Sequence, residues 1–425
     1  MFTQDFKDLV KHKIEHNSQR ILSIFQWTIA GILIGLGVGA FSSAFGLSMR
    51  YVISARENHP WFVYFLPVGA IVITFIYNKI LRVKDNGTNT VIAAIQSDKH
   101  LPARLAPLIF VATLITHLVG GSAGREGAAL QMGGALGNGF ARILKLSDTD
   151  RKTMIMCGMS AAFSALFGTP MAAAIFSMEV ISVGIMHYSA LAPCVLSSLV
   201  GRWVAIQFGL RAEEYLIPDI PKFTFNTTIS IVAFSILCGL VSILFCAIMH
   251  YFEGFISNKL KNPYIKALIG GTSVLVLTLI VGEQTYNSTG SAIIASCFTG
   301  ASIGMGAFLL KIIFTTLTLS CGYKGGEIVP TLFIGATFGA AFGPLLGMPA
   351  SLSAAVGMGA LFCGVTNCPI TSLLICFELF GYDAMPYFLI SVAFSYWVSG
   401  YFGLYKSQKI VYSKYRSNYI DKHVK

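Results

Sequence analysis

Residues 121–137 place two charged side chains in sequence that is otherwise apolar. Arg125 and Glu126 lie among glycines in Gly-Ser-Ala-Gly-Arg-Glu-Gly, and the flanking runs 105–124 and 127–141 contain no Asp, Glu, Lys or Arg. A carboxylate buried in a membrane costs about 3 kcal/mol and is a functional-site hypothesis by default. The glycines predict irregular backbone and then a helix that begins near Glu126, whose free N–H groups attract anions. Glu126 could thus be a tethered anion that yields its place when it takes up a proton or when a free anion arrives.

The composition is that of a membrane protein with several spans. Of 425 residues, 55% are hydrophobic and 12% are charged, and the mean hydropathy is +0.69; these values exclude an ordinary soluble enzyme. The 42 glycines suit close packing and interruption of helices in lipid. Nine cysteines are scattered in apolar sequence without metal-ligand or redox spacing. We therefore expect small buried thiols, and neither a metal nor a cofactor.

The basic residues concentrate near both ends of the chain. A net charge of +11 could indicate nucleic-acid binding, but Lys and Arg accumulate in residues 1–20 and 405–425, as in cytoplasmic segments beside membrane spans. We expect both termini in the cytoplasm, membrane lipid around the protein and no nucleic acid as a partner. Within residues 1–18 the apolar side chains share one helical face, which predicts a surface amphipathic helix.

Long uncharged runs divide the chain into spans and connections. Residues 210–222 interrupt the apolar pattern with two prolines and no basic excess, which predicts an external linker. From Ile328 to Phe377 there is no charged residue but there are four prolines, so this stretch must hold several short elements. The predicted organisation is a cytoplasmic amphipathic helix at 1–20, a first half at 21–209, the linker at 210–222, a second half at 223–404 and a basic cytoplasmic tail at 405–425.

The two halves resemble one another. With an offset of 202 residues, Gly124 falls on Gly326, Gly133 on Gly335 and Gly137 on Gly339. Residues 167–179 and 366–378 both place a glutamate nine residues after a proline, ending at Glu179 and Glu378; we expect these two glutamates to support the fold. Repeats joined by an external linker, with both termini inside, imply inverted topology and broken helices that meet at an ion site near the midplane.

These motifs resemble those of the CLC family of chloride channels and anion/proton antiporters. Gly-Arg-Glu-Gly at 124–127 is similar to the gating-glutamate motif of that family, and Gly-Glu-Ile-Val-Pro at 326–330 is similar to its second anion-site loop. Tyr405 resembles the tyrosine that closes the inner side of the anion path. The resemblance covers roughly residues 20–410 and implies an all-α integral membrane protein, a CLC-type inverted repeat of tilted and broken helices. It further implies a homodimer that pairs through the faces near 190–208 and 385–402.

Three departures from the chloride pattern resemble the fluoride-specific branch of the family. The loop at Gly87-Thr88-Asn89 lacks the serine and proline of chloride members, Val180 follows Glu179 where an internal proton-relay acid would stand, and Glu327 replaces an apolar residue. The resemblance therefore implies a proton-coupled fluoride antiporter that exports F⁻ from the inner (plasma) membrane and confers fluoride resistance. Fluoride is strongly hydrated and needs several strong donors. By this resemblance Glu126 and Glu327 would serve gating and proton transfer, and the anion would be bound by Gly87, Thr88, Asn89, Gly124, Arg125, Gly127, Gly326, Ile328, Val329 and Tyr405.

Several alternatives remain open from the sequence. A passive F⁻/Cl⁻ channel or a chloride/proton antiporter would share this fold, whereas an integral-membrane enzyme finds no supporting motif. Glu126 could be a salt-bridge partner of Arg125, Glu327 a helix cap, and Tyr405 an interfacial anchor. Thr88 and Asn89 could be plain turn residues. Among the other polar residues, His117 is expected to be packed or hydrogen-bonded, and the role of Lys324 is undetermined.

Overall fold

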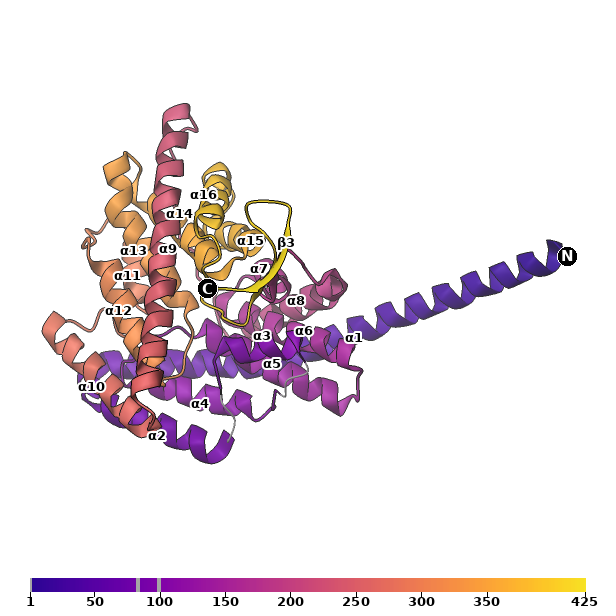
Figure 1. Cartoon of the computed structure of the whole chain (residues 1–425), viewed down its shortest axis with the longest axis horizontal. Coiled ribbons are helices and arrows are strands. Elements are labelled where there is room, and N and C mark those ends of the chain that lie inside the picture. Colours follow the sequence, from indigo (N-terminus) through magenta and orange to yellow (C-terminus); the bar gives the residue numbers. More distant parts are fainter. Residues whose placement is uncertain (1, 82–84, 98–100) are drawn as a thin grey trace.

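The computed structural model describes the backbone of residues 2–81, 85–97 and 101–425, with side chains from residue 21 onward except at residue 81. Most of this chain is helical, and helices of very different length and tilt pack around a common core (Figure 1). The predicted amphipathic face of residues 1–20 lies outside the described side chains.

The first part of the chain alternates long helices with short, interrupted ones. A short helix, α3, follows Gly87, and the helix predicted from Glu126 begins at that residue. Residues 153–178 form two helices, because Gly168 adopts a left-handed conformation and Pro170 begins a new helix. The elements are α1 (Phe2–Asn58), η1 (Pro60–Phe65), α2 (Leu66–Ile76), η2 (Tyr77–Leu81), α3 (Thr88–Gln96), α4 (Leu105–Leu118), α5 (Glu126–Ile143), α6 (Asp148–Phe167), α7 (Pro170–Glu179), β1 (Ser182–Val183), η3 (Tyr188–Ala190) and α8 (Leu191–Gln207).

The second part follows a linker in which residues 210–224, all described, form neither helix nor strand. The charge-free stretch from Ile328 contains several short helices, as predicted. Residues 284–310 hold loops, the short helix α11 and the start of α12. The elements are α9 (Phe225–Lys259), α10 (Pro263–Val281), α11 (Ser291–Ser296), α12 (Ala307–Ser320), α13 (Ile328–Phe342), η4 (Gly343–Leu346), α14 (Ala350–Thr366), α15 (Pro369–Phe380), α16 (Met385–Val398), β2 (Lys409–Tyr412) and β3 (Tyr419–His423).

The hydrophobic helices are those of a multi-pass membrane protein. Six helical segments in the described part of the chain are long and apolar enough to cross a membrane. Large apolar side chains on the outer helices are exposed, for example Leu240 on α9 at 52% and Trp203 on α8 at 57%, as expected where lipid or a partner replaces water. By contrast, 72% of the most apolar part of the helical segment Ile328–Leu346 is buried. This central helix is therefore surrounded by protein.

The two halves exchange reciprocal contacts, as an inverted repeat should. Glu179 at the end of α7 accepts hydrogen bonds from the backbone N–H groups of Ile370 (3.1 Å) and Thr371 (2.8 Å) at the start of α15. Glu378 near the end of α15 accepts from Met171 and Ala172 at the start of α7, both at 2.9 Å. Each glutamate satisfies N–H groups that a helix start leaves unpaired. Their predicted fold-supporting role is confirmed.

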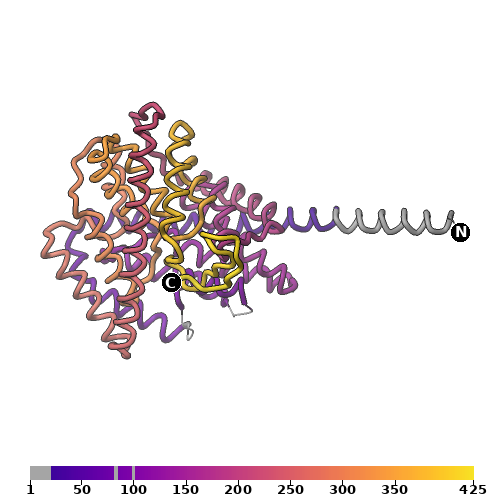
Figure 2. The backbone as a smooth tube through the Cα atoms, turned by 45° about the horizontal axis from the view of Figure 1, so that its top comes forward, coloured from indigo at the N-terminus to yellow at the C-terminus, as the bar shows by residue number. Residues whose placement is uncertain are grey.

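The C-terminal tail folds back onto the helices instead of leaving the protein. Strand β2 pairs in parallel with β1 and antiparallel with β3, and Figure 2 shows this last segment in yellow lying against the helical body. Gln408 Nε2 donates to Val180 O (3.0 Å) and to Thr366 O (2.8 Å). The tail therefore ties residues 403–408, and with them Tyr405, to the ends of α7 and α14.

Candidate functional site

The Glu126 carboxylate is folded back over the start of its own helix. One oxygen, Oε2, accepts from the backbone N–H of Arg125 at 3.1 Å, and the other, Oε1, lies 3.1 Å from Arg125 Nε. The side chain is completely buried. A carboxylate therefore occupies the place where the N–H groups and dipole of α5 would attract an anion. The predicted pairing with Arg125 is present, and it coincides with this position.

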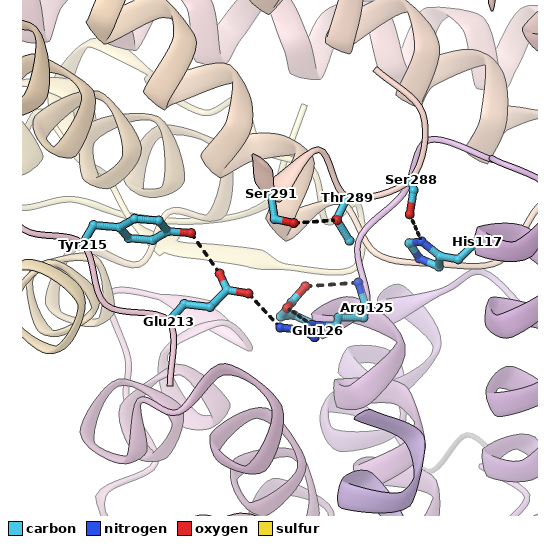
Figure 3. A network of polar contacts seen from close by, with 8 residues as sticks. All are labelled: His117, Arg125, Glu126, Glu213, Tyr215, Ser288, Thr289 and Ser291. Atoms are coloured by element: carbon cyan, nitrogen blue, oxygen red, sulfur yellow. Dashed lines mark hydrogen bonds and ion pairs between the residues drawn. The ribbon is translucent and has the colours of Figure 1, made fainter. Parts of the chain in front are cut away.

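Arg125 is shared between two carboxylates (Figure 3). Its Nη2 lies 2.8 Å from Glu213 Oε1, on the linker between α8 and α9. Tyr215 donates its hydroxyl to the other oxygen of Glu213 at 3.2 Å and stacks on Phe298, with ring centroids 4.9 Å apart. Burial and the Glu213 charge raise the pKa of the Tyr215 phenol, so it stays a neutral donor. Glu126, Arg125, Glu213 and Tyr215 thus form one continuous polar chain, which we call the linker chain.

The two glycine motifs meet at the centre of the fold. Gly124 and Gly326 form an antiparallel bridge in which each N–H donates to the other's carbonyl at 2.7 Å. A Cβ on Gly127 would lie 2.6 Å from Gly326 Cα and 3.5 Å from both Glu327 Oε2 and Thr88 Oγ1. Only glycine fits this approach. The starts of α3, α5 and α13 are therefore brought together, as the sequence predicted.

Three polar groups at this junction lack partners among the described residues. They are Thr88 Oγ1, Glu327 Oε2 and the Tyr405 hydroxyl, and each of these atoms is buried. Burial raises the pKa of the Tyr405 phenol, and the nearby charge of Glu327 raises it further. Buried polar atoms are normally hydrogen-bonded, and an unpaired hydroxyl costs about 1–3 kcal/mol. Such a cluster is expected where an ion or water completes the hydrogen bonding.

A cavity of about 260 Å³ reaches this junction from one side of the protein. Its polar wall includes Glu327, Asn89 and Gly87 from the two loops, together with His250 and Glu253 from the far end of α9. Asn89 Oδ1 accepts from the backbone N–H of Ser407 at 2.8 Å. This bond fixes the amide and leaves its NH₂ as the remaining donor. Asn89 therefore both holds the tail and lines the cavity.

The remaining predicted residues shape the backbone around the junction. Gly87 has φ 65° and ψ −143° just before α3, a backbone conformation that is unfavourable for residues other than glycine. Ile328 and Val329 are buried in the first turn of α13. Their side chains offer no hydrogen bonds, so they can contribute only backbone N–H groups to an anion.

Lys324 has an ion-pair partner that the sequence did not suggest. Its Nζ lies 2.8 Å from Asp85 Oδ2 and 4.3 Å from the Tyr77 ring centroid. Asp85 also accepts from the N–H of Gly87 at 3.0 Å. This buried pair joins the loop before α3 to the loop before α13. Its geometry supports a role in fixing these two loops relative to each other.

Two further cationic or titratable groups, His117 and Lys311, contact the loop before α11. His117 Nδ1 is 2.7 Å from Ser288 Oγ, so the predicted hydrogen-bonded histidine is confirmed. Lys311 is fully buried in α12 and donates to the carbonyls of Tyr286 (3.0 Å) and Ser288 (2.8 Å). The sequence analysis did not single out Lys311, although a lysine inside an apolar run was a visible signal. Together these hydrogen bonds hold the loop before α11 next to α4 and α12.

A family model described as voltage gated chloride channel matches residues 68–400 of the chain. The chain belongs to this family, the CLC proteins. The CLC chain is 34% identical over 398 residues to the chloride/fluoride channel protein of Pseudomonas syringae pv. tomato, an alignment that covers 92% of this chain and 88% of that protein. It is 27% identical to the voltage-gated ClC-type chloride channel ClcB of Escherichia coli K12, with 86% of this chain and 92% of that one covered.

Solved structures agree with the CLC assignment. A CLC-type fluoride/proton antiporter superposes with a TM-score of 0.88 at 30% identity, covering 91% of this chain and 98% of that one. A slow cyanobacterial Cl⁻/H⁺ antiporter superposes with a TM-score of 0.76 at 17% identity, covering 88% and 94%; this second likeness concerns the fold alone. The protein is thus a multi-pass membrane protein of a family of channels and transporters.

Sequence reasoning missed the linker residues of the CLC site. From the sequence, Glu213 and Tyr215 were only two residues of a predicted external linker. No periodicity or motif shows that such a linker packs against the start of a helix far away in the sequence. The acidic pair Glu213-Glu214, in a chain that is only 12% charged, was the available signal. Within the described residues, no group of three or more His, Cys, Asp or Glu side chains is arranged to hold a metal ion.

Proposed function

We propose that this CLC protein is a proton-coupled fluoride antiporter that exports F⁻, with Glu126 as its gating and proton-carrying carboxylate. The observation that carries this proposal is the position of Glu126: a fully buried carboxylate that lies over the start of α5, beside a junction with three unpaired polar atoms. An anion that reached this helix start would compete with Glu126 for the same N–H groups. Anion entry and release of the carboxylate are therefore linked.

Proton coupling follows from the burial of Glu126. An ionised carboxylate in an apolar, enclosed place is costly once it leaves Arg125 and the helix start. Displacement by an anion therefore favours uptake of a proton, and return of the carboxylate favours its release. Glu327 is suited to serve as a second carboxyl on the cavity side, because it lines the cavity and its Oε2 has no partner among the described residues.

The donors at the junction suit a small, strongly hydrated anion. Thr88 and Tyr405 each present a hydroxyl without a partner in the described part of the chain, and Asn89, whose NH₂ is a further donor, lines the cavity. Backbone N–H groups of Gly127, Ile328 and Val329 add further donors. Several short, strong hydrogen bonds are what fluoride requires to leave water. The 30% identical antiporter named for fluoride and protons supports this choice of ion.

The proposal also includes the membrane in which the protein lies and its orientation there. We place the protein in the plasma (inner) membrane with both termini in the cytoplasm, so that the cavity at the end of α9 opens inward and the linker lies outside. Inward proton flow would then drive fluoride export and give fluoride resistance. The exposed apolar faces of α8 and α16, including Leu199 at 50% and Leu389 at 55%, would pair two subunits in a homodimer.

The test is paired ion flux from proteoliposomes that contain the purified protein. Fluoride efflux is followed with a fluoride electrode and proton uptake with an internal pH dye, with chloride as the competing anion. We expect fluoride efflux to drive proton uptake against a gradient, with chloride nearly inert. Glu126→Gln should abolish the coupled proton uptake, whereas Glu283→Gln, an exposed loop glutamate, should leave it unchanged.

Three outcomes would contradict the proposal. Rapid fluoride or chloride flux that cannot move protons would identify a passive channel, in which Glu126 is only a gate. Proton-coupled flux in which chloride replaces fluoride would identify a chloride/proton antiporter. Coupled uptake that persists in Glu126→Gln would show that another group carries the proton.

A further inference from the structure

The linker chain becomes progressively more exposed from the core to the surface. The Glu126 side chain is 0% exposed, that of Arg125 is 14% exposed and that of Glu213 is 32% exposed. Glu213 is therefore the member of the chain that solvent reaches, while the buried guanidinium links it to Glu126 (Figure 3). A guanidinium is always charged and offers several donors in a fixed plane, so it can hold two carboxylates at once.

The linker and the cavity lie toward opposite ends of α9. This helix has 35 residues, which corresponds to about 52 Å. It begins directly after the linker, and its last turns carry His250 and Glu253, which line the cavity. In the orientation proposed above, Glu213 therefore faces the outside, whereas Glu327 faces the cytoplasm. Neither Glu213 nor the linker has a role in the function proposed above.

Charge balance shows what Glu213 does for Arg125. With Glu126 ionised, the three charged groups carry a net charge of −1. When Glu126 takes up a proton or swings away, Arg125 and Glu213 still form a neutral pair at 2.8 Å. Without Glu213, the same event would leave Arg125 as a buried cation without a partner, which is strongly unfavourable. Glu213 therefore lowers the free energy needed to neutralise or displace Glu126.

We propose that Glu213 is a positioning residue that keeps Arg125 paired while Glu126 is protonated or displaced, and so sets the external pH at which transport runs. The inference rests on the proposed proton-coupled function. Tyr215 supports Glu213 by donating to its second oxygen and by stacking on Phe298. The linker thereby becomes part of the transport machinery.

The surroundings of Glu126 define what else could influence this pH dependence. Arg125 precedes it on the same motif, and Glu213 and Tyr215 approach from the linker. From α4, His117 lies near the charges of Arg56 on α1, Lys311 on α12 and Arg125, of which Arg56 has the largest effect. His117 and Lys311 are each held by bonds to the loop before α11. A substitution at Glu213 leaves those bonds in place.

The experiment measures coupled fluoride flux against external pH for Glu213→Gln. The matched control is Glu214→Gln, which removes the same charge from the adjacent, exposed linker position. We expect the pH of half-maximal flux to move about one unit to the acid side for Glu213→Gln, since a nearby charge shifts a carboxyl by about that much even when partly screened. Above that pH the flux should fall about tenfold. The control should follow the native curve.

Two further variants separate a pH effect from misfolding. Glu213→Asp retains the charge and should bring the pH profile back toward that of the native protein. In a Glu126→Gln background, where the fluoride flux is no longer coupled to protons, Glu213→Gln should cause no change in how that uncoupled flux depends on external pH, because the group on which it acts is absent. A Glu213→Gln profile that coincides with the native one, in a native protein that couples fluoride to protons, would overturn this inference alone. Absence of proton coupling in the native protein would instead overturn the proposed function.

Discussion

The Tyr405 hydroxyl should lower the stability of the fold and at the same time increase fluoride transport. Tyr405 is 1% exposed, and its hydroxyl has no hydrogen-bond partner among the described residues. Burying an unpaired hydroxyl costs about 1–3 kcal/mol. Tyr405→Phe removes this cost and keeps the ring, so the free energy of unfolding should stay the same or rise by about 1 kcal/mol. If the hydroxyl donates to fluoride, flux should fall about tenfold, the equivalent of one charge-assisted hydrogen bond.

Tyr323 provides the matched control. It is equally buried, at 3% exposed, but its hydroxyl donates to the Leu66 carbonyl. Tyr323→Phe leaves this carbonyl without its donor, and the free energy of unfolding should fall by about 1 kcal/mol. Tyr323 also lines the cavity, but its hydroxyl is bound to Leu66 and is not one of the unpaired atoms of the junction, so fluoride flux per folded protein should be unchanged. The two substitutions delete the same atom and should change stability in opposite directions, and only Tyr405→Phe should lower the flux.

Both quantities can be measured on the same purified samples. Unfolding in detergent gives the stability difference from the native protein, and efflux from proteoliposomes gives transport at equal protein density. The reasoning is refuted if Tyr405→Phe is less stable than the native protein while its fluoride flux is retained. That result would show that the phenol is bound by the protein itself and belongs to the packing of the tail.

Three further substitutions test other parts of the structure. Burial lowers the pKa of Lys414 to about 8, so the folded state is favoured when this lysine loses its proton. Between pH 7 and pH 9.5 the free energy of unfolding of the native protein should therefore rise by about 2 kcal/mol relative to that of Lys414→Met. The control is Lys409→Met at an exposed position, for which this difference should not change with pH. A constant difference in a pH series of unfolding curves would contradict this. Gly127→Ala should reduce fluoride flux at least about tenfold. The control Gly254→Ala should not reduce it, because there is open space around Gly254. Normal flux in Gly127→Ala would show that the junction can open to accept a methyl group. Glu378→Gln should lower stability by about 1–2 kcal/mol, seen as a lower unfolding temperature, and an unchanged temperature would mean that the start of α7 is solvated instead.

Local patterns predicted those features that depend on local chemistry. The start of α5 at Glu126 followed from glycine-rich backbone next to apolar helical sequence. The fold-supporting role of Glu179 and Glu378 followed from a repeated proline-to-glutamate spacing, but the partners of each glutamate in the other half did not. In both cases the residues that form the pattern lie within a dozen positions of one another, so the pattern is visible in the sequence.

Long-range pairing is what the sequence could not supply. The parallel pairing of β1 with β2 joins residues 182–183 to 409–410, and neither short segment is a strand by composition. Arg125 and Glu213 are 88 residues apart, yet they form an ion pair of 2.8 Å. A loop can carry such a residue without any periodicity, because its conformation is set by the helices it crosses.

The repeat explains why the two ends of the pathway carry different chemistry. The offset that places Gly124 on Gly326 also places Arg125 on Glu327 and Glu126 on Ile328. The antiparallel bridge between the two glycines holds the two loops side by side. One loop then carries a guanidinium paired with the linker, and the other a carboxylate that lines the cavity. A symmetric scaffold with unlike charges at equivalent positions gives each loop its own affinity for protons and anions. In the antiporter proposed above, this difference would separate the binding of the proton from that of the anion, and Glu327→Gln and Glu213→Gln would remove it by separate routes.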